Sequence, residues 1–372
     1  MATPDLLAAI LTDDPGELEK ARERVRASAG RGDRSLVADA ERAVRRAPRA
    51  AITFDANGSA TVVAGDREYC GGRFAPRSVG ELTTSIASRG GPSAPPPTFS
   101  VVEGSDPVTD IGALQAMAAP GTLFQVASQF NCLEAPGPDL VPVADYLHDP
   151  TQGPRASVSA FPGTMVRQYA APDRTGGTFT QTPEHQIDLL ADALPAGVGH
   201  VRSGYLQTAN IRDLEAAAVA LEDHLDRIRV GVHDDVEVVL GANWDGAVEG
   251  RPRIAQVFTS SLATGMYGRG ESVTGPVEAI CRHLLRAAHL GTMLAALEAG
   301  RTRVVLTMIG GGVFGNPHHL ILQAALWATE QVAALGAGPL DVVLNSRNLS
   351  PAVDREWLAD ECHRRGSVHR PI

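Results

Sequence analysis

The tightest restriction on the fold comes from a buried strand that runs through a glycine loop into a helix. The apolar run Arg303–Ile309 precedes the loop, and helical spacing begins at Pro317. Consecutive glycines let the backbone turn several N–H groups toward one point, and the helix contributes the positive end of its dipole. We therefore predict an anion-binding loop, with a plain tight turn as the alternative. The loop consists of Gly310, Gly311, Gly312, Val313, Phe314, Gly315 and Asn316.

Three of these glycines also spell a dinucleotide-binding motif, G-x-G-x-x-G. That motif should open a strand–helix–strand unit whose next strand ends in an acid about 20 residues later. The next expected strand, Leu340–Leu344, ends at Asn345 instead. Fewer than about 30 residues then remain, too few to complete a doubly wound sheet. The pattern therefore disfavours a nicotinamide oxidoreductase, and a Walker loop is excluded because no Gly-Lys-Ser/Thr follows.

Charge narrows the choice of partners. The chain of 372 residues is 44% hydrophobic and 20% charged, with a formal net charge of −10, which is typical of soluble proteins. An acidic chain does not attract nucleic acid over long distances, so we expect no nucleic-acid partner. An anionic ligand must then be held by local backbone amides and helix ends.

The sequence lacks the patterns that would indicate membrane insertion, secretion or metal binding. It has no apolar run of about 18 residues and no secretory signal at its start, so we expect no membrane association. Its four cysteines are widely separated, which is typical of a reducing compartment. We therefore expect a cytoplasmic protein. No His, Cys or Asp cluster has metal-ligand spacing, so we predict no required metal or cofactor.

The order of elements predicts an α/β fold with an N-terminal helical extension. Residues 1–50 have helical character, and a hairpin with an Asn57-Gly58 turn follows. A Gly-, Ser- and Pro-rich linker, Ser88–Pro97, precedes alternating strands and helices. We predict an extension and linker over 1–95, an α/β domain over 96–350 and a tail over 351–372. The expected strands are Thr98–Val102, Thr122–Gln129, Val236–Gly241, Ile254–Ser260, Arg303–Ile309 and Leu340–Leu344, and the expected helices are Asp188–Leu194, Ile211–Arg227, Pro276–Ala299 and Pro317–Leu335.

A second polar segment follows the strand predicted at Thr122–Gln129. Gln129 and Asn131 fall at its carboxyl end, where open α/β sheets bind ligands. Asn131 can both donate to and accept from sugar hydroxyls, although a plain turn residue is the alternative. Further along, Asp149–Tyr169 contains Gly163 and Thr164, and its glycines and prolines predict a shaped functional loop.

Together these segments resemble a macrodomain, the superfamily that binds ADP-ribose. The resemblance implies a three-layer α/β/α mixed sheet and covers about Val101 to Asn345. In Thr109-Asp110-Ile111-Gly112, it implies that Asp110 accepts from the adenine amine and that Ile111 lies beside it. It implies that Asn131 faces the ribose and that Gly310–Asn316 is the second phosphate loop, with Phe314 beside the distal ribose.

The sequence departs from that family where a central glycine triplet should follow the asparagine. The Gly153–Tyr169 segment stands in its place, and with the Gln125–Glu134 run it is similar to a divergent branch found in bacterial effectors. That branch resembles hydrolases that remove ADP-ribose from arginine side chains. The implied partners are ADP-ribose and ADP-ribosylated protein.

Cleaving such an N-glycosidic bond passes through an oxocarbenium-like transition state, which an aligned carboxylate stabilises. The guanidinium also needs a carboxylate partner. The candidate acids are Asp245, Glu249 and Glu134, with Asp149 in addition. We favour Asp245, because Gly246 beside it permits a tight turn. Each acid could instead be a solvated loop residue.

Alternatives to arginine hydrolysis remain open. A non-catalytic reader of ADP-ribose would use the same pocket without the acids. A hydrolase acting on linkages to acidic side chains or within a polymer would use the same ligand with a different leaving group.

Overall fold

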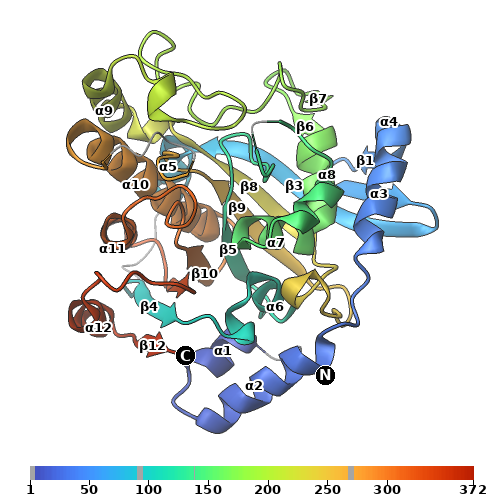
Figure 1. Ribbon diagram of the computed structural model, residues 1–372, viewed down its shortest axis with the longest axis horizontal. Coiled ribbons are helices and arrows are strands. Elements are labelled where there is room, and N and C mark those ends of the chain that lie inside the picture. The colour runs from blue at the N-terminus through green and yellow to red at the C-terminus, as the bar shows by residue number, and fades with distance from the viewer. Residues whose placement is uncertain (1–4, 90–94, 138, 267–271) are drawn as a thin grey trace.

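A ten-stranded mixed sheet forms the centre of the fold (Figure 1). The computed structural model describes residues 5–89, 95–137, 139–266 and 272–372. The strand order is β1-β2-β3-β8-β9-β5-β10-β11-β4-β12. Pairs from β1 to β9 along this order are antiparallel, and pairs from β9 to β12 are parallel. The strands are β1 Ile52–Phe54, β2 Ala60–Ala64, β3 Arg67–Ser78, β4 Thr98–Glu103, β5 Thr122–Ala127, β8 Arg229–Glu237, β9 Arg253–Thr259, β10 Arg303–Thr307, β11 Asp341–Ser346 and β12 His369–Pro371, with β6 Ala171–Pro172 and β7 Thr178–Phe179 in a separate hairpin.

Helices cover both faces of this sheet. Helix α10 packs against α5, α9 and α11, whereas α6, α7 and α8 pack together with the N-terminal α3. The helices are α1 Leu6–Leu11, α2 Pro15–Ser28, α3 Ser35–Arg46, α4 Pro48–Ala51, α5 Val79–Ala87, α6 Ile111–Ala116, α7 Gln152–Ser159, α8 Phe161–Tyr169, α9 Leu214–Asp223, α10 Gly275–Glu298, α11 His318–Leu335 and α12 Arg355–Arg364.

Two buried glutamines show that these groups lie on opposite faces. The Gln125 amide in β5 donates to Ala288 O of α10 at 3.2 Å, and the Gln256 amide in β9 donates to Ala156 O of α7 at 3.0 Å. Gln256 pairs in register with Phe124, the neighbour of Gln125. Because successive strand residues point to opposite faces, α10 and α7 enclose the sheet from two sides. The predicted mixed α/β sheet is confirmed.

The long helices follow from local sequence. Pro276 occupies the first turn of α10, where its missing N–H costs nothing, and buried positions such as Ile280 and Leu284 recur at helical spacing. Burying each such side chain stabilises the fold by roughly 1.5–3 kcal/mol. Helix α11 ends where Gly336 adopts a left-handed φ of 60°.

The N-terminal segment contributes to the same sheet. Strand β3 is the long strand that joins the predicted hairpin, β1 and β2, to β8. This strand was not predicted, because Gly71, Gly72 and Pro76 are residue types that strands usually exclude. The sheet therefore crosses the predicted division at residue 95. Beyond residue 350, α12 and β12 pack against β4.

Three expected elements differ from the structure. The strand predicted at Val236–Gly241 is β8, Arg229–Glu237, which has an irregularity between His233 and Val236. The helix predicted at Asp188–Leu194 is a series of turns. The loop predicted at Asp149–Tyr169 contains two helices, α7 and α8. That prediction was wrong because its prolines sit in the first helical turns, where the helix leaves N–H groups unpaired in any case.

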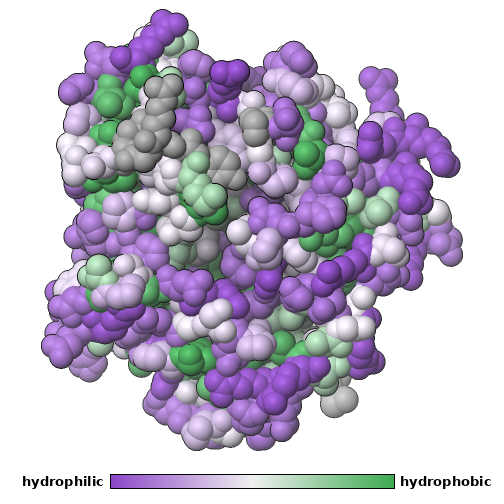
Figure 2. Space-filling view, in the orientation of Figure 1, coloured by the Kyte–Doolittle hydropathy of each residue, from purple (hydrophilic) through white to green (hydrophobic). Residues whose placement is uncertain are grey.

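None of the helices in the described ranges is long and apolar enough to cross a membrane. On the face shown in Figure 2, hydrophobic residues form separate small groups among hydrophilic ones. This face therefore shows no broad apolar surface.

Candidate active site

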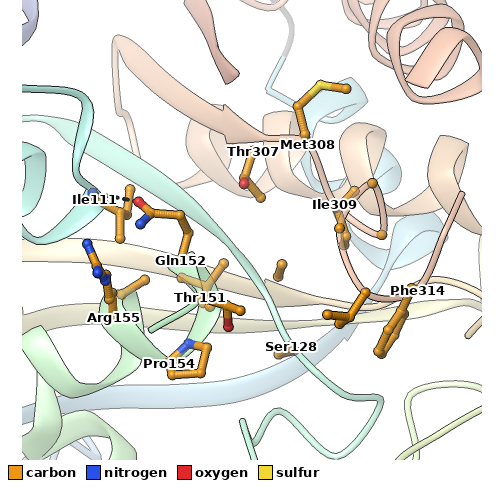
Figure 3. Close-up of a pocket in the computed structure, with 18 of the residues that line it drawn as sticks. Ile111, Ser128, Thr151, Gln152, Pro154, Arg155, Thr307, Met308, Ile309 and Phe314 are labelled. Atoms are coloured by element: carbon orange, nitrogen blue, oxygen red, sulfur yellow. Dashed lines mark hydrogen bonds between the residues drawn. The ribbon is translucent and has the colours of Figure 1, made fainter. Parts of the chain in front are cut away.

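A cavity of about 490 Å³ opens where the parallel strands end. Its walls come from the carboxyl ends of β5, β10 and β11 and from the start of α7. Crevices of this size and position hold small-molecule ligands in α/β proteins. Figure 3 shows the start of α7 on one side of the cavity and the segment from Thr307 to Phe314 on the other.

The predicted glycine loop forms the second wall. Gly310 and Gly315 adopt left-handed φ angles of 74° and 69°, which permit the turn. The N–H of Gly311 donates to Met308 O, so this amide is used within the loop. No hydrogen bond of the Gly312 or Val313 N–H is found within the described ranges. These two amides are available to an anion, and anion binding by this loop stays a prediction.

The side chain of His318 holds the glycine loop in place. Its Nε2 lies 3.0 Å from Gly311 O, and its Nδ1 accepts from the Ser350 N–H at 2.9 Å. An Nδ1 that accepts a hydrogen bond carries no proton, so the hydrogen bond to Gly311 O is donated by Nε2. His318 therefore connects the glycine loop to the segment after β11.

The start of α7 faces this loop across the cavity. Pro154 has no N–H, and the Arg155 N–H bonds to Thr151 O. The N–H groups of Gln152 and Gly153 are the first-turn donors that point out of a helix N-terminus. The Gln152 side chain is used internally, because its Oε1 accepts from the Ile111 N–H at 2.9 Å (Figure 3). A helix end and a glycine loop thus face one another, an arrangement suited to a diphosphate.

Glu134 supplies a buried carboxyl group to the cavity. Its side chain is 8% exposed, and its Oε1 is buried without a hydrogen-bond partner within the described ranges. Burial raises the pKa of Glu134 well above its usual value, the charge of Arg167 opposes this rise, and Asp149 adds to it. Glu134 therefore retains a proton at pH values where an exposed glutamate has lost it.

The segment that carries Glu134 is held rigidly. Cys132 adopts a left-handed φ of 63°, which is uncommon for a residue with a side chain. The guanidinium of Arg167, itself fully buried, donates from Nε to Cys132 O at 3.0 Å. Asn131 accepts from the Leu133 N–H through its side-chain oxygen and donates to Gln186. Asn131 is fully buried and is not part of the cavity wall.

Aromatic rings mark the end of the cavity beside Glu134. Ala135 O accepts from the Tyr205 hydroxyl at 3.1 Å and from the Gln129 amide at 2.6 Å. The ring of Tyr205 lies 5.8 Å from that of Phe314, centroid to centroid. Gln129, Tyr205 and Phe314 all line the cavity. Apolar ring faces next to a proton-holding carboxyl can receive a sugar ring.

Asp110 lies just outside the cavity, behind Ile111 and Arg155. Its Oδ1 accepts from the N–H groups of Gly112, Ala113 and Asn243, and its Oδ2 forms an ion pair with Arg155. Ile111 and Arg155 line the cavity themselves. In this arrangement the Asp110 carboxylate is occupied by groups of the protein, and its contact with an adenine remains a prediction.

The remaining predicted residues lie away from the cavity wall. Asp245 lies 3.4 Å from the guanidinium of Arg34, and Glu249 is exposed on the loop before β9. Gly163 and Thr164 are buried inside α8. Gly315 and Asn316 support the glycine loop, and the Asn316 amide donates to Leu262 O at 2.7 Å. Of the three proposed catalytic acids, the structure thus brings only Glu134 to the glycine loop, as judged over the described ranges.

Sequence reasoning missed several lining residues: Ser105, Gln152, Arg155, Tyr205, Arg347 and Asn348. Arg347 and Asn348 could have been predicted from the sequence, because they directly follow a parallel strand, where open α/β sheets bind ligands. No signal existed for Tyr205, which comes from irregular chain between the hairpin and α9. Among the described residues, no group of three or more His, Cys, Asp or Glu side chains could hold a metal ion.

No family model and no curated protein matches the chain. Solved structures of poly(ADP-ribose) glycohydrolases resemble it. The enzyme from Thermomonospora curvata is 13% identical over 89% of this chain and 98% of that chain, with a TM-score of 0.42. The enzyme from Deinococcus radiodurans is 11% identical over 78% of this chain and 93% of that chain, with a TM-score of 0.40, both in its apo form and with ADP-ribose.

These findings correct the assignment to the macrodomain superfamily and to its arginine-specific branch. No family model supports it, and the similar structures are poly(ADP-ribose) glycohydrolases. The short motifs behind the resemblance have another physical cause. Asp110 is the N-cap of α6, and Asn131 stabilises a tight turn. Both residue types are favoured in those roles in any fold.

Proposed function

We propose that the cavity binds ADP-ribose and that the chain is a hydrolase releasing it from an oxygen-linked acceptor. The observation that carries this proposal is the position of Glu134. A buried carboxyl that retains its proton lies in the same cavity as the glycine loop and the start of α7. The two backbone walls suit a diphosphate, and the aromatic end suits the sugar attached to it.

The chemistry follows from the protonation state of Glu134. Its proton passes to the leaving oxygen as the bond between that oxygen and the ribose C1 breaks, which leaves an oxocarbenium-like sugar. Water then adds to C1, and the Glu134 carboxylate takes up the proton that the water loses. The carboxyl group is thereby restored, and the products are ADP-ribose and an alcohol or acid.

An oxygen-linked acceptor fits this site better than arginine. A guanidinium leaving group is already cationic and is held by ionised carboxylates, ideally in bidentate fashion. Within the described part of the chain, Glu134 and Asp149 are the acids that line the cavity, and burial raises the pKa of Glu134 and so favours its neutral form. A neutral carboxyl group is instead suited to protonating an oxygen.

The decisive experiment compares wild type with Glu134→Gln. We expect the variant to bind ADP-ribose with unchanged affinity in calorimetry and to lose at least about 100-fold in hydrolysis, the usual contribution of a general acid. Substrates should carry ADP-ribose on a hydroxyl, on a carboxyl and on arginine. The matched control is Glu184→Gln, an exposed glutamate in the turn Thr182–His185.

Two results would contradict the proposal. If the wild-type protein does not bind ADP-ribose at millimolar concentration, ADP-ribose is not the ligand of the cavity. Binding without turnover of any of the three substrates by the wild-type protein would favour the non-catalytic reader.

A further inference from the structure

Two arginines, Arg155 and Arg347, line the cavity. Figure 3 shows Ile111 and Arg155 on one side of the cavity and Phe314 on the other. Arg347, after β11, lines the cavity together with Ser105. Arg347 bonds to Thr109 and Arg155 pairs with Asp110, the next residue, so both guanidinium groups lie on the side of the cavity away from Phe314, in a protein whose formal net charge is −10.

Hydrogen bonds fix both guanidinium groups around the same short segment. Arg347 donates to Asp106 O at 2.9 Å, to Thr109 Oγ1 at 2.8 Å and to Ser105 Oγ at 3.0 Å. Arg155 pairs with Asp110, the residue next to Thr109. The Nε of Arg155 is buried without a partner within the described residues.

These cations outnumber the carboxylates near them. All three Arg347 contacts are to neutral oxygens, and the ion pairs of the described residues include none for Arg347. The Asp106 carboxylate is paired with Arg22 at 2.9 Å, and that of Asp110 with Arg155. Burial lowers the pKa of Arg347, Asp110 opposes this, and the charge of Arg155 adds to the lowering. This side of the cavity thus holds one positive charge without a matching negative one.

This surplus charge concerns the part of the ligand beyond the diphosphate. If the proposed function holds, the reacting ribose lies beside Glu134 and the diphosphate lies between the glycine loop and α7. The adenosine then extends toward Arg155 and Arg347. Adenosine is neutral and cannot balance a half-buried cation, whereas a phosphate on its ribose can. Guanidinium groups bind phosphate through two parallel hydrogen bonds.

We propose that the preferred ligand carries a further phosphate on its adenosine ribose, bound by Arg347 and Arg155. This inference rests on the proposed function and deepens it. The phosphate has two possible sources: a monoester on the 2′-hydroxyl, or the diphosphate of a second ADP-ribose unit joined through that hydroxyl. The monoester places its phosphate directly on the 2′ oxygen, whereas in the dimer one ribose separates that oxygen from the second diphosphate, so the two probes also differ in the distance that the guanidinium groups must span.

The test is calorimetry of the full chain with three probes: ADP-ribose, ADP-ribose 2′-phosphate and a dimer of ADP-ribose. We expect at least one phosphate-bearing probe to bind about tenfold or more tightly than ADP-ribose, as one charge-assisted contact provides. The advantage should shrink as salt rises. The probe that shows it identifies the source.

Arg347→Gln should abolish this advantage and leave the affinity for ADP-ribose within about twofold. Arg155→Lys keeps a charge opposite Asp110 and should reduce the advantage without unfolding the chain. Thermal unfolding checks that both variants are folded.

Each failure points to a different error. If ADP-ribose itself does not bind, the proposed function fails. If all three probes bind the wild type equally, the proposed function stands and the two arginines do not form a phosphate site. Equal loss for all probes in Arg347→Gln would mean that Arg347 holds the base or the loop, which overturns the phosphate assignment.

Discussion

A Cβ atom placed on Gly153 would lie 2.6 Å from Glu134 Oε2 and 2.5 Å from Ala127 O. Only glycine therefore allows the start of α7 to approach the carboxyl group this closely. The contact places the helix N-terminus beside Glu134, where its positive end favours developing negative charge. It also explains why Gly153, which the sequence predicted to lie in a loop, sits in the first turn of α7.

Gly153→Ala should displace Glu134 and the first turn of α7. We expect a loss of about 1–3 kcal/mol in the free energy of unfolding, as overpacking usually costs, and a larger relative loss of hydrolysis. Denaturant unfolding and turnover measure the two effects. Gly197→Ala is the matched control, because a Cβ there meets no atom within 4 Å. Full activity in Gly153→Ala would show that the carboxyl position is not critical.

The pH dependence of hydrolysis should reveal the raised pKa of Glu134. The proton donor exists only below that pKa, so we expect kcat to fall as pH rises through it. The contribution of Glu134 to the free energy of unfolding should also decrease as pH rises. A group whose pKa is higher in the folded state stabilises the fold fully below its unfolded pKa, and that contribution is lost as pH rises through the folded value.

Glu134→Gln supplies the comparison for that prediction. The free energy of unfolding of wild type, relative to the variant, should decrease between pH 5 and pH 8 in urea titrations. Parallel stability curves for the two proteins over this range would mean that Glu134 titrates normally. Its assignment as the proton donor would then fail.

Local sequence predicted much of the parallel half of the sheet. Strand β10, the glycine loop and α11 all match the expected strand–loop–helix order, because their glycines and apolar spacing act locally. The antiparallel half was poorly predicted. Strand β3 is stabilised by pairing with β8, about 150 residues away in sequence. Its glycines and proline are atypical of strands, so its own sequence does not indicate one.

The site was predicted where backbone chemistry defines it and missed where folding brings side chains together. The glycine loop needs no distant partner to be recognised. The choice among acids did depend on the fold: Asp245 was favoured because of a neighbouring glycine, yet it lies beside Arg34 at the surface. Glu134 is distinguished by burial and by its contact with α7, and neither property can be read from its neighbours in sequence.

Gly312 offers a direct test of the anion-binding loop. A Cβ on this residue would meet no atom within 4 Å, so a side chain can be added without disturbing the fold. Gly312→Glu places a negative charge beside the proposed diphosphate, and we expect at least about a tenfold loss of ADP-ribose affinity. Gly312→Ala adds bulk without charge and should retain affinity within a few-fold. If both variants bind like wild type in calorimetry, the diphosphate is held elsewhere.

His289 provides a prediction about stability that is independent of the site. It is fully buried in α10, and neither ring nitrogen has a hydrogen-bond partner among the described residues. Burial lowers its pKa to about 3. Between pH 6.5 and that value the unfolded chain takes up a proton that the folded chain does not, so stability falls as pH falls, by at most about 1.4 kcal/mol per pH unit.

His289→Leu removes both the unpaired nitrogens and the titration. We expect the variant to be at least as stable as wild type at pH 7 and distinctly more stable at pH 5, because an apolar side chain of similar size does not take up a proton on unfolding. Urea unfolding at the two pH values measures this difference. His319→Leu, which replaces an exposed histidine near the start of α11, is the control and should leave the slope unchanged. An unchanged slope in His289→Leu as well would mean that His289 exchanges protons with solvent in the folded state, through an opening of the contact between α10 and the sheet.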